Sequence, residues 1–336
     1  MGHLTRRTLL KSTLAASAAL ASPALVRSAT ASDATPLSFQ LDWKYNAQFA
    51  GLFMAQADGL YGAENLDVTI REWNNDIRVL EAVGSGEMEM GCAEQSLIVA
   101  AQAAGAPVKA VATMFQASPY GLMTLPDTPM ETLDDLKGKQ VGVHDDGAKV
   151  MALVKSVNGY AQGDIELVEV PYDDKFGLVT RGEMTTVQCY VIDEPIGVAK
   201  TYGITPKIMH MRDHGFVSTA QTIVVHEKTL AEKPDAVRAF LSATFQGWDK
   251  VLADKPAAAE VVVDQFVPKG SIYKDVAYQT ETLELLEDYV TGTDGTAEIG
   301  KIDAGRWATM AEQMVQFGIV ETAPPADASL ALDYYT

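Results

Sequence analysis

The stretch L-S-F-Q-L-D-W-K-Y-N-A-Q-F-A-G, residues 37–51, contains the pattern that decides the fold. Its first five residues are mainly apolar and predict a strand, and residues 47–58 predict a helix. Asp42, Trp43 and Asn46 lie between the two, at the carboxyl end of the strand. In an open α/β sheet, ligands bind at that end. The alternative is that Trp43 and Phe49 belong to the core and that the polar groups cap the helix.

The same alternation of strand and helix continues in two blocks. The first block has strand character at residues 67–73, 88–92, 108–115 and 121–125, with helices predicted at 76–83 and 95–104. Pro126 and Pro129 end it. The second block has strand character at residues 141–144, 165–170, 186–192 and 207–211, with helices predicted at 147–157, 174–181 and 195–202. Each block therefore predicts a mainly parallel, doubly wound α/β sheet.

Helices dominate after residue 226. A long amphipathic helix begins at Pro234, and further helices are predicted at residues 256–266, 278–290 and 304–317. We assign them to the first block, which requires the chain to cross between blocks near residues 121–127 and 215–221. The prediction is lobe 1 at residues 32–124 plus 220–336 and lobe 2 at residues 125–219. Two α/β lobes joined in this way close over a ligand by hinge motion.

The first 31 residues have the features of an export signal. Arg6-Arg7 forms a twin-arginine pattern, an apolar run covers residues 12–25, and Ala29-Thr30-Ala31 is a cleavage site. A membrane anchor is the alternative, but the run of about 14 residues is shorter than the roughly 20 needed to span. We therefore expect a twin-arginine signal peptide at residues 1–31, cleavage near Ala31 and a periplasmic protein.

The charge of the chain argues against nucleic acid as a partner. The formal net charge is −19, and removal of the four basic residues of the leader makes it −23. A surface this acidic repels phosphate backbones. Cys92 and Cys189 are too few for a disulfide scaffold and lie in apolar runs, so buried free thiols are the expectation, with a disulfide as the alternative. No cysteine and histidine cluster has metal-ligand spacing.

Candidate ligand-binding residues gather where the predicted strands end. They are Asp42, Trp43, Asn46, Phe49, Glu94, Gln95, Gln116, Tyr120, His144, Asp146, Tyr190 and Glu194. Helix capping is the alternative for several of them, including Glu94 and Asp146. Acidic residues outnumber basic ones in this set, which favours a neutral or cationic ligand with N–H donors over a sulfonate, nitrate or phosphate.

Several of these segments resemble one protein family in order and spacing. They are Leu41-Asp42-Trp43 with Asn46 and Gly51, residues 84–91, residues 137–142 and Asp193-Glu194-Pro195. Over residues 37–250 the chain resembles the periplasmic solute-binding proteins of the thiamine-pyrimidine and sulfonate–nitrate group, in the pyrimidine-precursor branch. The resemblance implies a bilobal periplasmic-binding-protein fold of type II and delivery of the ligand to an ABC importer permease. It also implies that Trp43 stacks on a pyrimidine ring and that Glu194 pairs with its amino edge.

The same fold also hosts an enzyme, the fungal synthase that makes the hydroxymethylpyrimidine of thiamine from a histidine and pyridoxal phosphate. That enzyme has a lysine and a histidine after its third strand and cysteines near the second crossing. Here residues 91–97 contain neither lysine nor histidine, and residues 214–220 contain no cysteine. The sequence therefore predicts a monomeric, non-enzymatic binding protein without a cofactor, for a small aminopyrimidine. Riboflavin, taurine, an alkanesulfonate or nitrate as the ligand, and a synthase, are the alternatives.

Overall fold

The computed structural model describes residues 34–292, 295 and 298–336. The predicted signal peptide lies outside these residues. Within the described part of the chain, no helix is both long enough and apolar enough to cross a membrane.

The first sheet combines early strands with one late strand. In sheet order it consists of β2 (Leu66–Arg71), β1 (Thr35–Gln40), β3 (Met90–Ala93), β10 (Ala220–His226) and β4 (Val108–Phe115). β1 is parallel to β2 and β3, whereas β10 is antiparallel to both of its neighbours. The start of β10 therefore lies at the same edge as the carboxyl ends of β3 and β4.

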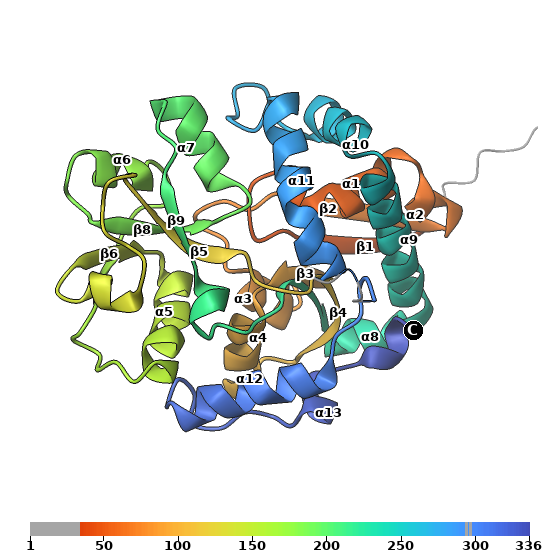
Figure 1. Cartoon of the computed structure of the whole chain (residues 1–336). Coiled ribbons are helices and arrows are strands. Elements are labelled where there is room, and N and C mark those ends of the chain that lie inside the picture. The colour runs from red at the N-terminus through yellow and green to blue at the C-terminus, as the bar shows by residue number, and fades with distance from the viewer. Residues whose placement is uncertain (1–33, 293–294, 296–297) are drawn as a thin grey trace, which may run out of the picture. The chain divides into compact units, whose positions relative to one another are not determined.

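The second sheet is built in the same manner from the middle of the chain. Its order is β7 (Glu166–Glu169), β6 (Gln140–Val143), β8 (Thr186–Tyr190), β5 (Tyr120–Thr124) and β9 (Lys207–His210). β6 is parallel to β7 and β8, and β5 is antiparallel to β8 and β9. In Figure 1 this sheet lies to the left with α5, α6 and α7, and the first sheet lies to the right.

The structure corrects the sequence analysis at β5. The strand predicted at residues 121–125 is expected in the sheet of the first block, but β5 pairs with β8 and β9 of the second sheet. The reason is that the chain leaves the first sheet in the short link of residues 116–119, before the strand rather than after it. The lobe boundaries themselves remain a prediction.

Helices cover both sheets. Those that flank the second sheet are α5 (Asp145–Val157), α6 (Lys175–Thr180) and α7 (Glu194–Tyr202). The others are α1 (Ala50–Ala57), α2 (Leu60–Ala63), α3 (Val79–Gly84), α4 (Gln95–Ala103), α8 (Glu227–Glu232), α9 (Pro234–Ala253), α10 (Lys255–Val261), α11 (Val276–Thr291), α12 (Ala304–Gln316) and α13 (Ala326–Ser329). The helix predicted at residues 47–58 is a 3-10 turn (Ala47–Phe49) followed by α1.

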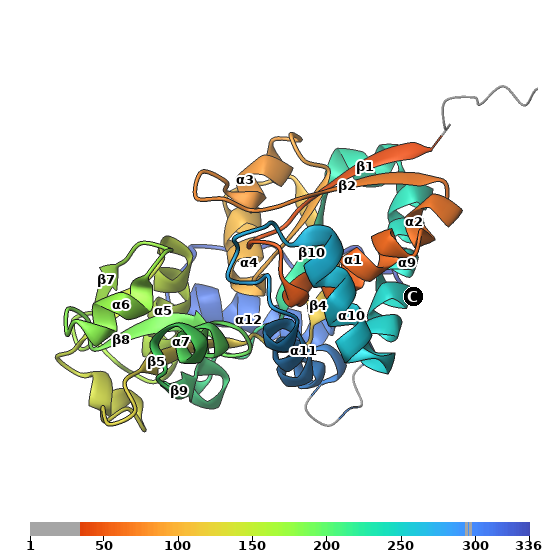
Figure 2. The ribbon, with the colours of Figure 1, turned by 90° about the horizontal axis from the view of Figure 1, so that it is seen from above.

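The core of the first sheet depends on a close crossing of α1 and α9, which lie side by side in Figures 1 and 2. A Cβ atom at Gly247 would overlap the carbonyl oxygen of Gly51, and one at Gly51 would overlap the ring of Trp248. Trp248 is fully buried. The two helices can approach this closely because glycine stands at both positions.

The two links between the sheets, residues 116–119 and 215–219, lie next to each other. The Ser118 amide donates to the Ser218 carbonyl at 2.7 Å. Both links thus form a paired connection, and the strand ends of the two sheets meet beside it.

Candidate ligand-binding site

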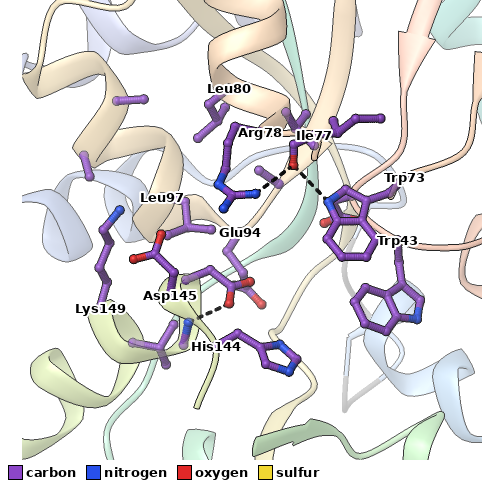
Figure 3. Close-up of a pocket in the computed structure, with 18 of the residues that line it drawn as sticks. Trp43, Trp73, Ile77, Arg78, Leu80, Glu94, Leu97, His144, Asp145 and Lys149 are labelled. Atoms are coloured by element: carbon purple, nitrogen blue, oxygen red, sulfur yellow. Dashed lines mark hydrogen bonds between the residues drawn. The ribbon is translucent and has the colours of Figure 1, made fainter. Parts of the chain in front are cut away.

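A cavity of about 720 Å³ is lined by residues from both sheets and their helices. Eight of the twelve predicted site residues line it: Asp42, Trp43, Glu94, Tyr120, His144, Asp146, Tyr190 and Glu194. In Figure 3, Trp43 and Trp73 lie together at one end, Asp145 and Lys149 lie at the other, and Glu94 and His144 lie between them.

Two residues of the first stretch have structural roles instead. Asn46 is fully buried and caps the 3-10 turn, accepting a hydrogen bond from the Gln48 amide at 2.7 Å. Phe49 is fully buried and packs edge-on against Phe53. Neither lines the cavity. The alternative of cap and core is therefore the one that the structure supports at these two positions.

Two glutamines are also held away from the cavity. Gln95 accepts from the Thr219 amide at 3.2 Å, and Gln116 donates to the Lys301 carbonyl at 3.0 Å. These bonds attach the links between the sheets to the surrounding chain. Their side chains are thus occupied by backbone groups and do not line the cavity.

An aromatic cluster forms one wall. The rings of Trp43 and Trp73 are stacked with centroids 5.0 Å apart. The centroid of the Tyr172 ring lies 4.7 Å from that of Trp73 and 4.0 Å from that of His144. Trp43 and His144 are nearly parallel, at 17°, with centroids 6.5 Å apart. Because Trp43 follows β1 and His144 follows β6, this cluster joins the two sheets.

A chain of hydrogen bonds fixes Trp43. Its Nε1 donates to the Tyr273 hydroxyl at 2.8 Å, and that hydroxyl donates to Asp193 Oδ2 at 3.1 Å. Asp193 also accepts from Tyr278 at 2.7 Å and from Gln48 at 3.0 Å. Burial raises the pKa of Asp193 to about 7, and the nearby Glu194 adds to the increase.

Glu94 connects the two links between the sheets. Its carboxyl accepts from Ser118 at 2.6 Å, from Tyr190 at 2.8 Å and from Ser218 at 3.2 Å. Burial raises its pKa to about 7, against the lowering effect of these hydroxyl donors. Glu94 lines the cavity, but its hydrogen-bonding capacity is largely used within the protein.

Glu194 is likewise already paired. It forms an ion pair with Lys175 and accepts from the Tyr190 amide at 2.6 Å. The Lys175 side chain is only 6% exposed. Lys175, which is not among the residues predicted for the site, adds a buried positive charge, so the cavity is less acidic than predicted.

His144 presents a neutral donor to the cavity. Gln188 Oε1 accepts from the His144 amide at 2.7 Å and from the Tyr120 hydroxyl at 3.1 Å. Gln188 Nε2 consequently faces His144 Nδ1, at 3.0 Å, and donates to it. The ring proton is thereby assigned to Nε2, which is buried and has no hydrogen-bond partner among the described residues. Burial, with a contribution from Lys175, lowers the pKa of His144 to about 2, which keeps the ring neutral.

Asp42, which follows β1, lies beside Cys92 of the neighbouring strand β3. Cys92 Sγ donates to Asp42 Oδ1 at 3.7 Å. Burial raises the pKa of Asp42 to about 7, and burial also raises that of the Cys92 thiol. Cys92 and Cys189 are both buried free thiols, as expected. Among the described residues, no group of three or more histidine, cysteine, aspartate or glutamate side chains is arranged to hold a metal ion.

The cavity continues as an open groove between α3 and α4. Its walls are mainly apolar and include Leu80, Leu97, Ala100, Ala101 and Ala104. Arg78 and Lys149, both exposed, also contribute to its lining. Figure 3 shows Leu80, Leu97 and Arg78 above the aromatic and acidic part of the site.

Several residues that line the cavity are absent from the predicted set, although some of them lie at strand ends. Trp73 follows β2 and Tyr172 follows β7. Both therefore lie at the carboxyl ends of strands, where ligand-binding residues were expected, and both line the cavity. Gln221 stands at the start of antiparallel β10, which lies at the same edge. Lys175 begins a short helix and carries no such signal.

Comparison with known proteins identifies the family. Residues 46–259, more than half of the chain, match the model of the family described as NMT1/THI5 like. The chain belongs to the NMT1/THI5-like family. This confirms the resemblance found in the sequence.

Its relatives carry two kinds of name. A riboflavin-binding protein, RibY of Chloroflexus aurantiacus, is 26% identical over 294 residues, which are 85% of this chain and 81% of the relative. A 4-amino-5-hydroxymethyl-2-methylpyrimidine phosphate synthase of Saccharomyces cerevisiae is 26% identical over 259 residues, which are 72% of this chain and 74% of the relative.

Solved structures show the fold. The ligand-binding component of an ABC-type import system from Staphylococcus aureus superposes with a TM-score of 0.68 at 15% identity, covering 90% of this chain and 98% of that one. The predicted periplasmic-binding-protein fold is therefore confirmed.

Proposed function

We propose that this protein is the solute-capturing subunit of an ABC importer and that its ligand is a planar, uncharged nitrogen heterocycle. The observation that supports this most is the character of the buried hydrogen-bonding groups left free in the cavity. His144, Gln48 and Gln221 line it, and among the described residues His144 Nε2, Gln48 Oε1 and both amide atoms of Gln221 are buried without a hydrogen-bond partner; none of the four is charged. They lie in a cavity that also has aromatic rings in its wall.

The buried charges of Lys175, Glu194 and Asp193 support the same choice because each already has partners within the protein. The buried Lys175 is neutralised by Glu194, and Asp193 is bonded to two tyrosines and a glutamine. A sulfonate, nitrate or phosphate is stabilised in a dry site by a free cation, an arginine fork or a helix N-terminus without nearby carboxylates. The remaining basic lining residues, Arg78 and Lys149, are exposed. A neutral ring fits this distribution better than an anion.

The size of the cavity favours a ligand larger than one pyrimidine. Pockets of about 300–1,000 Å³ hold drug-sized ligands, and this cavity of about 720 Å³ falls in that range. A monocyclic aminopyrimidine, the ligand predicted from the sequence, occupies only part of it. A tricyclic flavin fills more of it, and a relative is named as a riboflavin-binding protein. We therefore place a flavin beside the aminopyrimidine as the second candidate.

Capture by closure follows from the origin of the wall residues. Trp43 comes from the first sheet, whereas His144 and Tyr172 come from the second, and only the links at residues 116–119 and 215–219 join the strands of the two sheets. Opening at these links would separate Trp43 from His144 and admit a ring. A planar ring inserted between Trp43 and His144 would contact each of them at about 3.5 Å and would therefore need about 7 Å between the two rings. Their centroids are 6.5 Å apart, slightly less than this. Export to the periplasm, a permease partner and a monomeric state belong to this proposal.

The enzymatic alternative rests on the relatives named as pyrimidine phosphate synthases. Residues 91–97 lack the lysine and the histidine, and residues 214–220 lack the cysteines, that the resemblance assigns to the synthase. We therefore favour binding without reaction. Incubation of the protein with pyridoxal phosphate and iron tests this directly: we expect no hydroxymethylpyrimidine phosphate by mass spectrometry, and its formation would establish the enzyme instead.

A thermal-shift screen tests the ligand class. Riboflavin, 4-amino-5-hydroxymethyl-2-methylpyrimidine, taurine, an alkanesulfonate and nitrate are each added to purified protein. A ligand at 100 times its Kd stabilises the fold by about 2.7 kcal/mol. We expect stabilisation by riboflavin or the pyrimidine and none by the anions. Stabilisation by a sulfonate alone would contradict the proposal.

A further inference from the structure

Gln221 is a buried polar residue of the cavity whose two amide atoms make no hydrogen bond of normal geometry with any described residue. The residue lines the cavity and its side chain is fully buried, yet neither Oε1 nor Nε2 has a hydrogen-bond partner in the part of the chain that the structure describes. Buried amides are almost always hydrogen-bonded, since leaving them unpaired costs free energy. The amide lies close enough to Asp42 to lower the pKa of that carboxyl, which burial raises, but without the geometry of a hydrogen bond.

The backbone at Gln221 is held in an unfavourable conformation. Its φ is +50°, in the left-handed region that residues other than glycine seldom occupy. The flanking residues fix it there: the Thr113 hydroxyl donates to the Ala220 carbonyl at 3.0 Å and lies 2.9 Å from the Thr222 hydroxyl. Gln221 is also skipped in the pairing of β10 with β4, where Ala220 and Thr222 are paired. Strain of this kind is typical of functional positions.

We propose that Gln221 determines ligand specificity by pairing with a ring edge that places a hydrogen-bond acceptor beside an N–H donor. A primary amide offers one acceptor and two donors on adjacent atoms. It therefore forms two parallel hydrogen bonds with a lactam or imide edge, or with the ring nitrogen and amino group of an aminopyrimidine. A sulfonate or nitrate has acceptors only and leaves Gln221 Oε1 unpaired. This inference rests on the proposed function and names the edge that the site recognises.

The conformation of Gln221 provides a variant that separates recognition from folding. Glycine adopts φ of +50° without strain, so Gln221→Gly is expected to fold at least as well as the wild type. A residue retained for packing would instead lose stability on this change. Gln102→Leu is the control for removal of a buried amide outside the cavity: its Oε1 has no partner among the described residues, and its Nε2 donates to the Val108 and Ser329 carbonyls.

The experiment measures binding by isothermal titration with four probes. They are riboflavin, its N3-methyl derivative, 4-amino-5-hydroxymethyl-2-methylpyrimidine and the 4-dimethylamino analogue of that pyrimidine. The wild type is expected to bind at least one parent compound at least tenfold more tightly than its methylated analogue, because methylation removes the donor and leaves a buried acceptor unpaired. Gln221→Gly is expected to bind both members of the pair equally and weakly, and Gln102→Leu is expected to match the wild type.

The outcomes distinguish the two proposals. If the wild type binds a parent compound and Gln221→Gly retains both its affinity and its discrimination, the role of Gln221 is wrong and the proposed function stands. If the wild type binds none of the four probes, the proposed ligand class fails and the inference fails with it. Circular dichroism and thermal unfolding of each variant show that a loss of binding is not a loss of fold.

Discussion

The Lys175–Glu194 pair sets the charge of the site. Both side chains are largely buried, and Glu194 also accepts from the Tyr190 amide. Removing one member of such a pair leaves an uncompensated charge. Lys175→Met should therefore lower the free energy of unfolding by about 3–5 kcal/mol. The double variant Lys175→Met with Glu194→Gln should recover much of this loss in urea denaturation. Equal destabilisation by the single and double variants would contradict the pairing.

Glu94 gives the protein a predictable dependence on pH. Its pKa rises from 4.5 to about 7 on folding, so the folded protein binds more protons than the unfolded chain between these values. The contribution of Glu94 to stability is therefore complete below pH 4.5 and is lost as the pH rises through 7. Asp42 and Asp193, raised from 3.8 to about 7, act in the same direction.

Glu94→Gln removes this proton and should flatten the pH profile. Between pH 4.5 and 7 the free energy of unfolding of the wild type should fall relative to that of the variant by up to about 1.4 kcal/mol per pH unit. Urea denaturation at half-unit intervals measures the difference. Glu64→Gln, at an exposed position, is the control. Parallel curves for Glu94→Gln and the wild type would show that Glu94 ionises normally.

At the residue scale, the sequence identified side chains at strand ends but not their partners. Trp43 and His144 lie in the cavity because they follow parallel strands, which the pattern of apolar residues reveals. The ion pair of Lys175 with Glu194 and the bond from Tyr273 to Asp193 join segments that are distant in sequence. No local pattern contains that information.

At the scale of elements, the crossing of α1 and α9 depends on two glycines. A Cβ at Gly247 would overlap the Gly51 carbonyl oxygen and lie 3.0 Å from the Ala55 amide nitrogen. Since the neighbour is backbone, it cannot move aside cheaply, and Gly247→Ala should destabilise the fold by about 1–3 kcal/mol. Gly62→Ala, where nothing lies within 4 Å, is the matched control and should change stability little. Similar melting temperatures for both variants would contradict the packing.

The positions of helices and strands along the chain could be predicted well from the sequence. The strand expected at residues 108–115 coincides with β4, and the helix expected at residues 304–317 is α12, which Asp303 caps. What could not be predicted is which sheet β5 joins. The direction of the short link before a strand decides which sheet the strand joins. An apolar strand such as β5 is compatible with either sheet, so its sequence does not reveal the choice.

At the scale of the whole molecule, Asp193 connects parts that carry different walls of the site. It lies at the start of α7, beside the second sheet, and accepts from the Tyr278 hydroxyl of α11 at 2.7 Å. Loss of this bond should favour opening. Tyr278→Phe is expected to raise the dissociation rate of riboflavin or the pyrimidine about two- to tenfold, corresponding to ~0.5–1.5 kcal/mol, with little change in the association rate.

Stopped-flow fluorescence measures both rates. Tyr289→Phe is the control, because its hydroxyl makes only a 3.5 Å contact with His210. A dissociation rate that is unchanged in Tyr278→Phe would mean that this contact does not hold the closed form.

We propose that the cavity between the two sheets captures a neutral heterocycle through Trp43 and the aromatic cluster around it. Isothermal titration of wild type and Trp43→Ala with riboflavin and the aminopyrimidine tests it most directly, with Tyr334→Ala, which lies outside the cavity, as the control. We predict saturable binding of one compound by the wild type and the control, and at least tenfold weaker binding by Trp43→Ala. Equal affinity in all three proteins, or no binding of either compound by the wild type, would contradict the claim.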